Sequence, residues 1–260
     1  MNNHPALYLQ SFSEISAEGI TTRSGLLSWT SEQTGPEDIR RAQVLERPYM
    51  AFGKLNLPDK LAFSAASLAL RNTVINDPAA TALFLGIPEG SLSTDKEYLE
   101  TLVNGTPSPA LFSATHPSSP IADIAIFHHL KGPNICFAGG DSPFIAALES
   151  VILQMRHNNL KEALIVFIDE GKTTVSPDGS RLSPYAAAFF LSTEPQDTKV
   201  PSWSLERLST EGRPSDLPGN DRTIIRQLIA ALRHEESLRI PVSVGGFIGY
   251  ISLRFNRKDI

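Results

Sequence analysis

Hydrophobic and polar positions are most clearly patterned over residues 131–155, and the rest of the chain is organised around this stretch. A short apolar run at residues 135–138 favours a buried strand, which Gly139 and Gly140 should end. The sequence Asp141-Ser142-Pro143 is typical of a helix start, because proline is tolerated in the first helical turn. The apolar residues that follow recur at helical spacing and should face a core: Phe144, Leu148, Val151, Ile152 and Met155.

Further apolar runs predict strands at residues 6–12, 82–86, 163–168 and 185–191. The run at 163–168 does not alternate with polar residues, which indicates burial on both faces. Towards the end of the chain, residues 202–208 predict an edge strand, and residues 242–244 and 247–255 predict the last strands.

Capping residues and helical spacing predict four more helices, which begin near Pro58, Ser93, Ser119 and Asn220. In the helix over residues 93–104, Leu99, Leu102 and Val103 should face inward. The remaining stretches have weaker patterns. Residues 17–48 predict loop or short helix, residues 108–112 an irregular apolar segment, and residues 172–183 and 209–221 turns or loops. Strands that alternate with helices indicate an α/β protein whose sheet is covered on both faces.

The chain has 260 residues and a formal net charge of −5, which fits one large domain or two small ones. This acidity and the lack of a basic stripe argue against nucleic-acid binding. The single cysteine, Cys136, excludes an intramolecular disulfide. The first residues lack the pattern of a signal peptide, and no apolar run approaches the ~20 residues that span a bilayer, so we expect a cytoplasmic protein.

The turn before the central helix is a place where enzymes often hold a nucleophile, since the helix dipole favours negative charge there. The residue at that point is Asp141, and its carboxylate is a poor nucleophile when the helix lowers its pKa. An N-cap is the simpler interpretation of Asp141. Cys136 lies five residues earlier, inside the strand, and cannot replace it. Ser142 in a nucleophile elbow is disfavoured, because the second glycine of that motif is missing.

Cofactor and metal motifs are absent from the sequence. It has no P-loop and no GxGxxG, so we expect no nucleotide cofactor. His128, His129 and Asp123 are close in sequence, but adjacent histidines on a helix point in different directions. We therefore expect no metal site and no cofactor.

Residues 108–148 read SPALFSATHPSSPIADIAIFHHLKGPNICFAGGDSPFIAAL, and this segment resembles the N-terminal half of β-ketoacyl synthases, which have the thiolase fold. In that family a Ser-Pro segment leads to a helix, a Gly-Pro turn and a strand that delivers a nucleophilic cysteine to a helix N-terminus. The stretches IVFIDEG at 165–171 and SPYAAAFFLS at 183–192 fit the next two strands. The resemblance covers about residues 5–195. It implies half of a thiolase-type fold with a mixed sheet, in a single domain over residues 1–260 with a C-terminal extension from about residue 196.

The chain departs from the family at the catalytic residues. Asp141 stands where the family has its cysteine, and the second half, which supplies two histidines, is missing. His157 and His234 are instead typical of solvated helix positions. The resemblance therefore implies a synthase relative without condensation chemistry. It is similar to chain-length factors, which pair with an active ketosynthase and shape the tunnel for the growing chain, as in aryl polyene pathways.

The resemblance also implies which residues face the partner. The family segment that crosses the dimer and lines the partner's acyl tunnel matches four residues: Leu111, Phe112, Thr115 and His116. The strand that pairs across the two-fold axis matches five: Asn134, Ile135, Cys136, Phe137 and Ala138. Core packing is the alternative for Leu111 and Phe112, and a small buried hydrophobe is the alternative for Cys136.

The expected partners are an active ketosynthase subunit, in a heterodimer, and an acyl carrier protein reached through that complex. Two other functions remain open. The chain could be a stand-alone, weak acyl-transfer or decarboxylating enzyme that uses Asp141 or Ser142. It could also be a structural assembly module that kept the half-thiolase fold.

Overall fold

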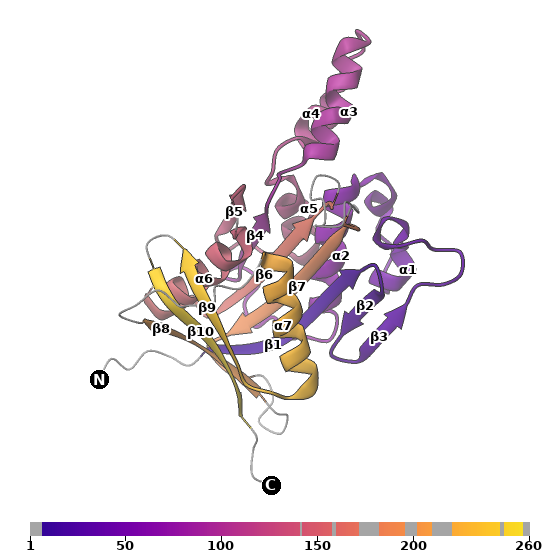
Figure 1. The fold of residues 1–260 in the computed structure, drawn as a ribbon. Helices are drawn as coiled ribbons and strands as arrows, with labels where there is room; N and C mark the ends of the chain where they lie inside the picture. The colour runs from indigo at the N-terminus through magenta and orange to yellow at the C-terminus, as the bar shows by residue number, and fades with distance from the viewer. Residues whose placement is uncertain are drawn as a thin grey trace.

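The structure is a computed structural model that describes residues 7–140, 142–157, 160–171, 182–195, 202–209, 220–244 and 247–256 (Figure 1). The predicted turn at residues 177–179 and most of the loop at 209–221 lie outside these residues. The strands are β1 (Leu7–Ser16), β2 (Gly19–Thr22), β3 (Gly25–Ser28), β4 (Ala82–Ile87), β5 (Asn134–Ala138), β6 (Glu162–Asp169), β7 (Tyr185–Ser192), β8 (Ser202–Ser209), β9 (Leu238–Val244) and β10 (Phe247–Asn256). The helices are η1 (Pro36–Asp38), α1 (Arg41–Val44), η2 (Met50–Lys54), α2 (Leu57–Leu70), α3 (Leu92–Val103), α4 (Pro109–Ala114), α5 (Ser119–His128), α6 (Pro143–His157) and α7 (Asp221–His234).

One mixed sheet runs through the protein in the order β5-β4-β6-β7-β1-β8-β10-β9, and the β2–β3 hairpin extends from β1. β4 is parallel to both β5 and β6, and the other pairs are antiparallel. Parallel strands need a crossover connection, and α6 supplies the one that leads from β5 across β4 to β6. The predicted α/β class is confirmed.

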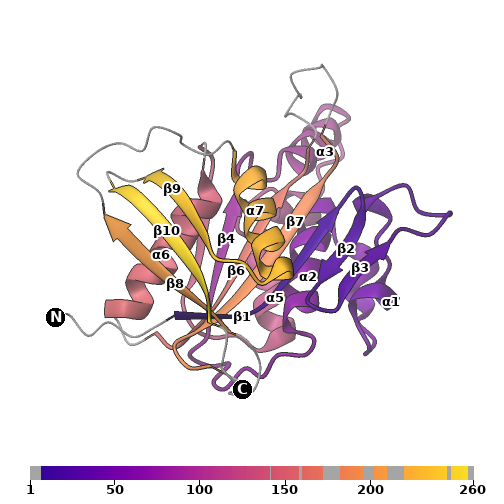
Figure 2. The same cartoon turned by 60° about the horizontal axis from the view of Figure 1, so that its bottom comes forward.

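Helices cover both faces of this sheet (Figure 2). On one face, α6 and α7 pack on residues such as Ile165 and Phe167 of β6. On the other face, α2 and α5 pack on the alternate residues Leu164 and Val166. Every residue of β6 is therefore buried, as the apolar run at 163–168 predicted.

Four local predictions are wrong. Residues 17–48 contain the β2–β3 hairpin as well as short helices, and residues 108–112 lie largely in α4. β8 pairs with both β1 and β10, so it is an interior strand and not an edge. The strand at residues 135–138 is the edge strand β5, and its residues are exposed or half-buried. The errors at β5 and β8 concern which strands these segments pair with, and distant parts of the chain decide that.

The C-terminal segment belongs to the same sheet and the same core. β8 pairs with β1, β10 pairs with β8, and apolar residues of α7 join the cluster that covers α6. The extension expected from about residue 196 therefore shares its sheet with the N-terminal strands, and its helix α7 joins their hydrophobic core. Within the described part of the chain, no helix is both long enough and apolar enough to cross a membrane.

Candidate functional site

The carboxyl ends of three strands meet the start of one helix at one edge of the sheet. β4, β5 and β6 run parallel, so their carboxyl ends lie together. After β5 the chain turns through Gly139 and Gly140, whose φ angles of 81° and 83° suit glycine. α6 then begins at Pro143, so the predicted strand, glycine turn and helix are confirmed. Asp141 itself, at the expected nucleophile position, lies outside the described residues.

β4 approaches the first turn of α6 so closely that a side chain would not fit between them. A Cβ atom at Gly86 would lie 2.9 Å from the backbone nitrogen of Phe144. The glycine that ends the predicted strand at 82–86 therefore has a packing function, because it lets the strand contact the helix start directly.

A carboxylate from the C-terminal segment accepts a hydrogen bond from the start of α6. The backbone N–H of Phe144 donates to Oδ2 of Asp221, the first residue of α7, at 2.8 Å. Asp221 is 3% exposed, and its Oδ1 has no hydrogen-bond partner within the described residues. Burial raises the pKa of Asp221 to about 6, although the amide hydrogen bond opposes this shift. Asn220 caps α7, as its position at the predicted helix start suggested, whereas Asp221 caps the first turn of α6.

The Asp221 carboxyl should make stability depend on pH. Its folded-state pKa is raised, so its contribution to stability is present below pH 3.8 and is lost as pH rises through about 6. Asp221→Asn keeps an oxygen for the Phe144 amide and does not titrate. We expect the free energy of unfolding of this variant, relative to wild type, to increase by about 2–3 kcal/mol across that interval, at 1.36 kcal/mol per pKa unit. Urea unfolding measured from pH 3.5 to 7.5 tests this. Asp95→Asn on exposed α3 is the control, and an equal pH profile for both variants would contradict the assignment.

The next residue of α7 forms a buried ion pair with the end of β6. Arg222 Nε lies 2.5 Å from Asp169 Oδ2, and Arg222 Nη1 donates to the Ser183 carbonyl at 2.8 Å. The other Asp169 oxygen accepts from the Gly171 amide at 2.8 Å. Asp221 and Arg222 thus fix α7 to the start of α6 and to the end of β6. A buried pair of this kind is strongly destabilising to break, because one charge is then left alone.

Two histidines at the end of α5, His128 and His129, make structural contacts. His128 is half-buried at the end of α5, where its Nε2 lies 2.9 Å from Ser67 Oγ, and desolvation lowers its pKa to about 4. His129 has a φ of 59° and ends the helix. Among the described residues, no group of three or more His, Cys, Asp or Glu side chains could hold a metal ion.

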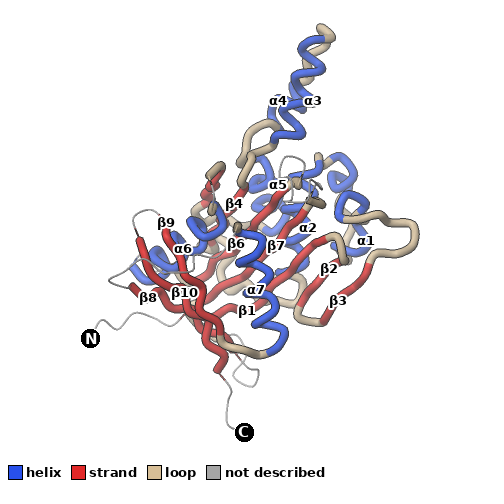
Figure 3. Tube along the Cα trace, in the orientation of Figure 1, coloured by secondary structure: helices blue, strands red, loops and turns tan. Residues whose placement is uncertain are grey.

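Two helices form an arm that projects from the body of the protein (Figures 1 and 3). Leu99, Leu102 and Val103 of α3 are 58%, 45% and 79% exposed, so the prediction that they face inward is wrong. Phe112 of α4 is 62% exposed and contacts Tyr98 of α3, with 5.5 Å between ring centroids. The arm thus carries four large apolar side chains on its surface, and core packing does not explain Phe112.

The other three residues of the predicted partner-facing set lie on the same arm. Leu111 and Thr115 are half-buried, and His116 is exposed. Ser108 caps α4 by accepting from the Leu111 amide, and Thr115 Oγ1 donates to the Phe112 carbonyl at 2.7 Å. These local bonds give the segment a defined helical shape, which the sequence analysis did not foresee.

Polar contacts hold the base of the arm against the body. Asn56, next to α2, donates from Nδ2 to Thr94 Oγ1 in α3 at 3.1 Å. Ser119, which opens α5 beyond the arm, donates to Asp59 Oδ2 at 3.2 Å. Burial, followed by the nearby Asp123 charge, raises the pKa of Asp59 to about 7. Both ends of the arm are therefore anchored to the N-terminal part of α2.

β5 presents one open backbone edge beside the arm. It pairs with β4 on one side, and no described strand pairs with its other side. Asn134 and Ala138 are exposed, while Ile135, Cys136 and Phe137 are half-buried. Cys136 Sγ lies 3.4 Å from the carbonyl of Pro117, at the base of the arm, and burial raises the pKa of its thiol to about 11. A thiol with this pKa is protonated at neutral pH and is a poor nucleophile.

Comparisons with known proteins identify the fold through solved structures. No protein-family model matches this chain, and no curated protein matches it. It is 18% identical, with a TM-score of 0.60, to a chain in the complex of the ketosynthase ApeO with its chain length factor ApeC from Xenorhabdus doucetiae. That alignment covers 97% of this chain and 99% of the other. The ishigamide ketosynthase/chain length factor matches at 18% identity and a TM-score of 0.60, over 88% of this chain and 73% of the other.

A third match has the highest TM-score of the three, 0.65, at 9% identity, and covers 96% of this chain and 99% of the other. It is AntDE:AntF, a type II polyketide synthase acyl-carrier protein in complex with its ketosynthase bound to the hexaketide. These likenesses show that the chain has the thiolase-type fold of ketosynthases, as predicted. Because coverage reaches 97% of this chain, most of the segment after residue 195 belongs to the shared fold.

Proposed function

We propose that this protein is a non-catalytic chain-length factor that pairs with an active β-ketoacyl-ACP synthase and shapes its acyl tunnel. One observation carries the proposal: an exposed apolar arm stands beside an open strand edge on a ketosynthase-type fold. Contiguous exposed apolar side chains mark interaction sites, and an open strand edge is a template for pairing. One surface thus offers both features that a heterodimer of this fold would use. The complex of ApeO with ApeC, a ketosynthase with its chain length factor, provides the precedent.

Within this proposal, the arm reaches the partner and helps to close its tunnel. Leu99, Leu102 and Val103 would be buried against the partner, and each such side chain contributes about 1.5–3 kcal/mol when fully buried. The segment with Leu111, Phe112, Thr115 and His116 would face the growing acyl or polyene chain. An acyl carrier protein would deliver that chain to the complex. An aryl polyene pathway is the proposed setting, from the resemblance of the sequence.

The absence of catalysis is also part of the proposal. Asp141 replaces the family cysteine, and Cys136 is half-buried with a raised pKa. The start of α6, where a nucleophile would be activated, donates its Phe144 amide to Asp221. A helix start that is capped by a carboxylate fits a structural role better than it fits a site that condenses thioesters.

We expect the purified chain alone to make no condensation product from acyl- and malonyl-carrier protein, with products followed by mass spectrometry. A candidate ketosynthase from the same gene neighbourhood, added back, should restore product formation. Ser142→Ala and Asp141→Asn serve as tests of the alternative enzyme. Turnover by the isolated chain that either substitution abolishes would refute the non-catalytic assignment. If the ketosynthase gives the same products in the same amounts without this chain, a structural assembly module becomes the better description.

A further inference from the structure

The sheet has a gap on one edge of β1, remote from the arm. On one side of β1, β7 pairs with residues from Tyr8 to Ile15. On the opposite edge, β8 pairs with residues 7–9 and β2 pairs with residues 13–16. Gln10, Ser11 and Phe12 lie between these two pairings, next to an irregularity in the register with β7. No described strand covers this edge at these three residues, so the sheet is open there.

A cavity of about 460 Å³ lies over this gap, within the size range of small-molecule sites. It is open to solvent on one side and is bordered by β1, by the β2–β3 hairpin and by the C-terminal end of α2. Phe12, Ile20 and Leu68 give it an apolar floor. The hydroxyl of Ser11, also in the lining, is buried and has no hydrogen-bond partner within the described residues.

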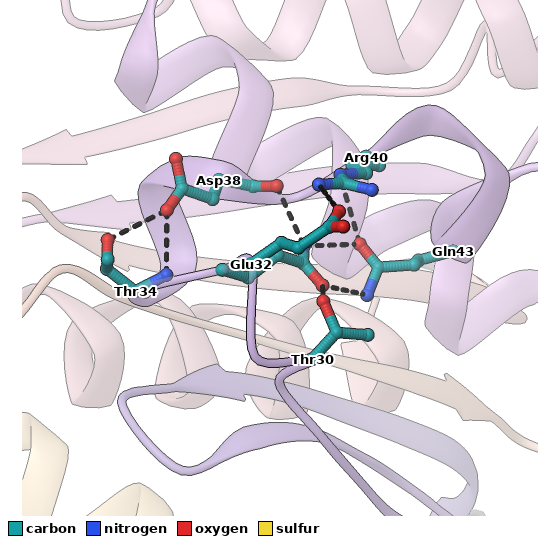
Figure 4. A network of polar contacts seen from close by, with 7 residues as sticks. Thr30, Glu32, Thr34, Asp38, Arg40 and Gln43 are labelled. Atoms are coloured by element: carbon teal, nitrogen blue, oxygen red, sulfur yellow. Dashed lines mark hydrogen bonds and ion pairs between the residues drawn. The ribbon is translucent and has the colours of Figure 1, made fainter.

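The charge of this cavity is opposite to that of the whole chain. Arg23 and Arg71 are the only charged side chains among the described residues that line it, although the chain carries a net charge of −5. Arg71 is held in place, since its Nη2 lies 2.5 Å from the carbonyl oxygen of Gln43. Figure 4 shows that Gln43 is itself fixed, because its Oε1 accepts from Gln33 Nε2 and from the Arg40 amide, both at 2.9 Å.

We propose that this cavity binds a small amphipathic anion, a carboxylate or phosphate head group on an apolar body. The guanidinium groups of Arg23 and Arg71 receive the head group, because arginine presents planar donors that match both anions. The apolar floor receives the body, and Ser11 offers a further donor. The site is separate from the proposed partner surface, since β4, β6 and β7 lie between β5 and β1 in the sheet.

Isothermal titration calorimetry with the full-length chain tests this proposal, using octanoate, octyl phosphate, inorganic phosphate, acetate and 1-octanol as probes. We expect saturable binding of octanoate or octyl phosphate at one site. Acetate, inorganic phosphate and octanol should each bind at least about tenfold more weakly, because each lacks the apolar body or the charge. Octanoate tighter than octyl phosphate identifies a carboxylate site, and the reverse identifies a phosphate site.

Variants locate the binding on the protein. Arg71→Gln and Arg23→Gln should each weaken binding about tenfold, and Lys54→Gln, an exposed lysine outside the cavity, should not. Thermal unfolding of each variant checks that the fold is retained, and both arginines are exposed enough to replace without loss of packing. Equal binding of octanoate and octanol, no binding of any probe, or equal effects of the Arg71 and Lys54 substitutions would overturn the proposal.

Discussion

Replacing Phe112 with alanine should lengthen the product of the assembled synthase by one or more two-carbon units. In the proposed complex, the segment from Leu111 to His116 closes the acyl tunnel, and Phe112 is its largest side chain. Protein interiors are close-packed, so removal of the phenyl ring should open space in the tunnel for several methylene groups of the acyl chain. Phe112→Trp should have the opposite effect and favour shorter products. His116→Ala should lengthen the product less, because its smaller side chain leaves less space.

This substitution should leave the protein folded. Phe112 is 62% exposed and its ring contacts Tyr98, so its loss should cost less than the ~3–5 kcal/mol typical of a buried phenylalanine. Leu102→Ala is the comparison variant, since it truncates an apolar residue of the same arm that would contact the partner but lies outside the tunnel segment. Size-exclusion chromatography first establishes that each complex is intact, and mass spectrometry then gives the product-length distribution.

If Phe112→Ala and His116→Ala both form normal complexes and the distribution does not move, the tunnel function of residues 111–116 is wrong. A shift that Leu102→Ala reproduces would also count against it, because the effect would then come from the arm as a whole.

Ala138→Pro should weaken the heterodimer by about tenfold to a hundredfold. The Leu83 amide donates to the Pro133 carbonyl at 2.8 Å, and the Gly139 amide donates to the Ile87 carbonyl at 2.9 Å. Backbone groups alternate between the two edges of a strand, so Ile135 and Phe137 also face β4. The N–H and C=O groups of Asn134, Cys136 and Ala138 are thereby directed to the open edge.

Proline at position 138 removes one outward donor and no hydrogen bond to β4. Its partner carbonyl in the interface would be left unsatisfied, which costs about 1–3 kcal/mol, or about one to two powers of ten in affinity. Ala138→Val is the control, because it adds bulk and keeps the N–H. Sedimentation or co-purification with the ketosynthase measures both. Equal affinities for the proline and valine variants would mean that the partner does not pair with this edge.

Much of the core could be predicted from local sequence. The apolar runs that became β4, β6 and β7 are buried on both faces, and their residues need no information about a particular neighbour. Asn220 and the amphipathic spacing after it were enough to predict α7, because capping and helical periodicity are local properties. The glycine turn before α6 was equally local, since Gly139 and Gly140 permit a conformation that other residues avoid.

The candidate site was predicted less well, because apolar spacing on a helix looks the same whether the helix faces its own core or another protein. Leu99, Leu102 and Val103 were therefore expected inside, although they are exposed on the arm. The contact between Asp221 and Phe144 joins residues 77 positions apart, and an acidic residue in a first helical turn is common without such a contact. The hairpin β2–β3 was missed because its strands have four residues each and carry polar side chains.

The position of β1 has a consequence for how the chain is made. This first strand lies between β7 and β8, so the Tyr185 hydroxyl that donates to Glu14 is synthesised 171 residues later. Long loop closure of this kind slows folding, and β2 is the one described strand that pairs with β1 and leaves the ribosome early. The α3–α4 arm is built midway through synthesis, before the sheet that supports it can close. A nascent chain of this protein would thus display its apolar arm to other molecules for much of its translation, and simultaneous synthesis of the ketosynthase would give that arm a partner at the time it is most exposed.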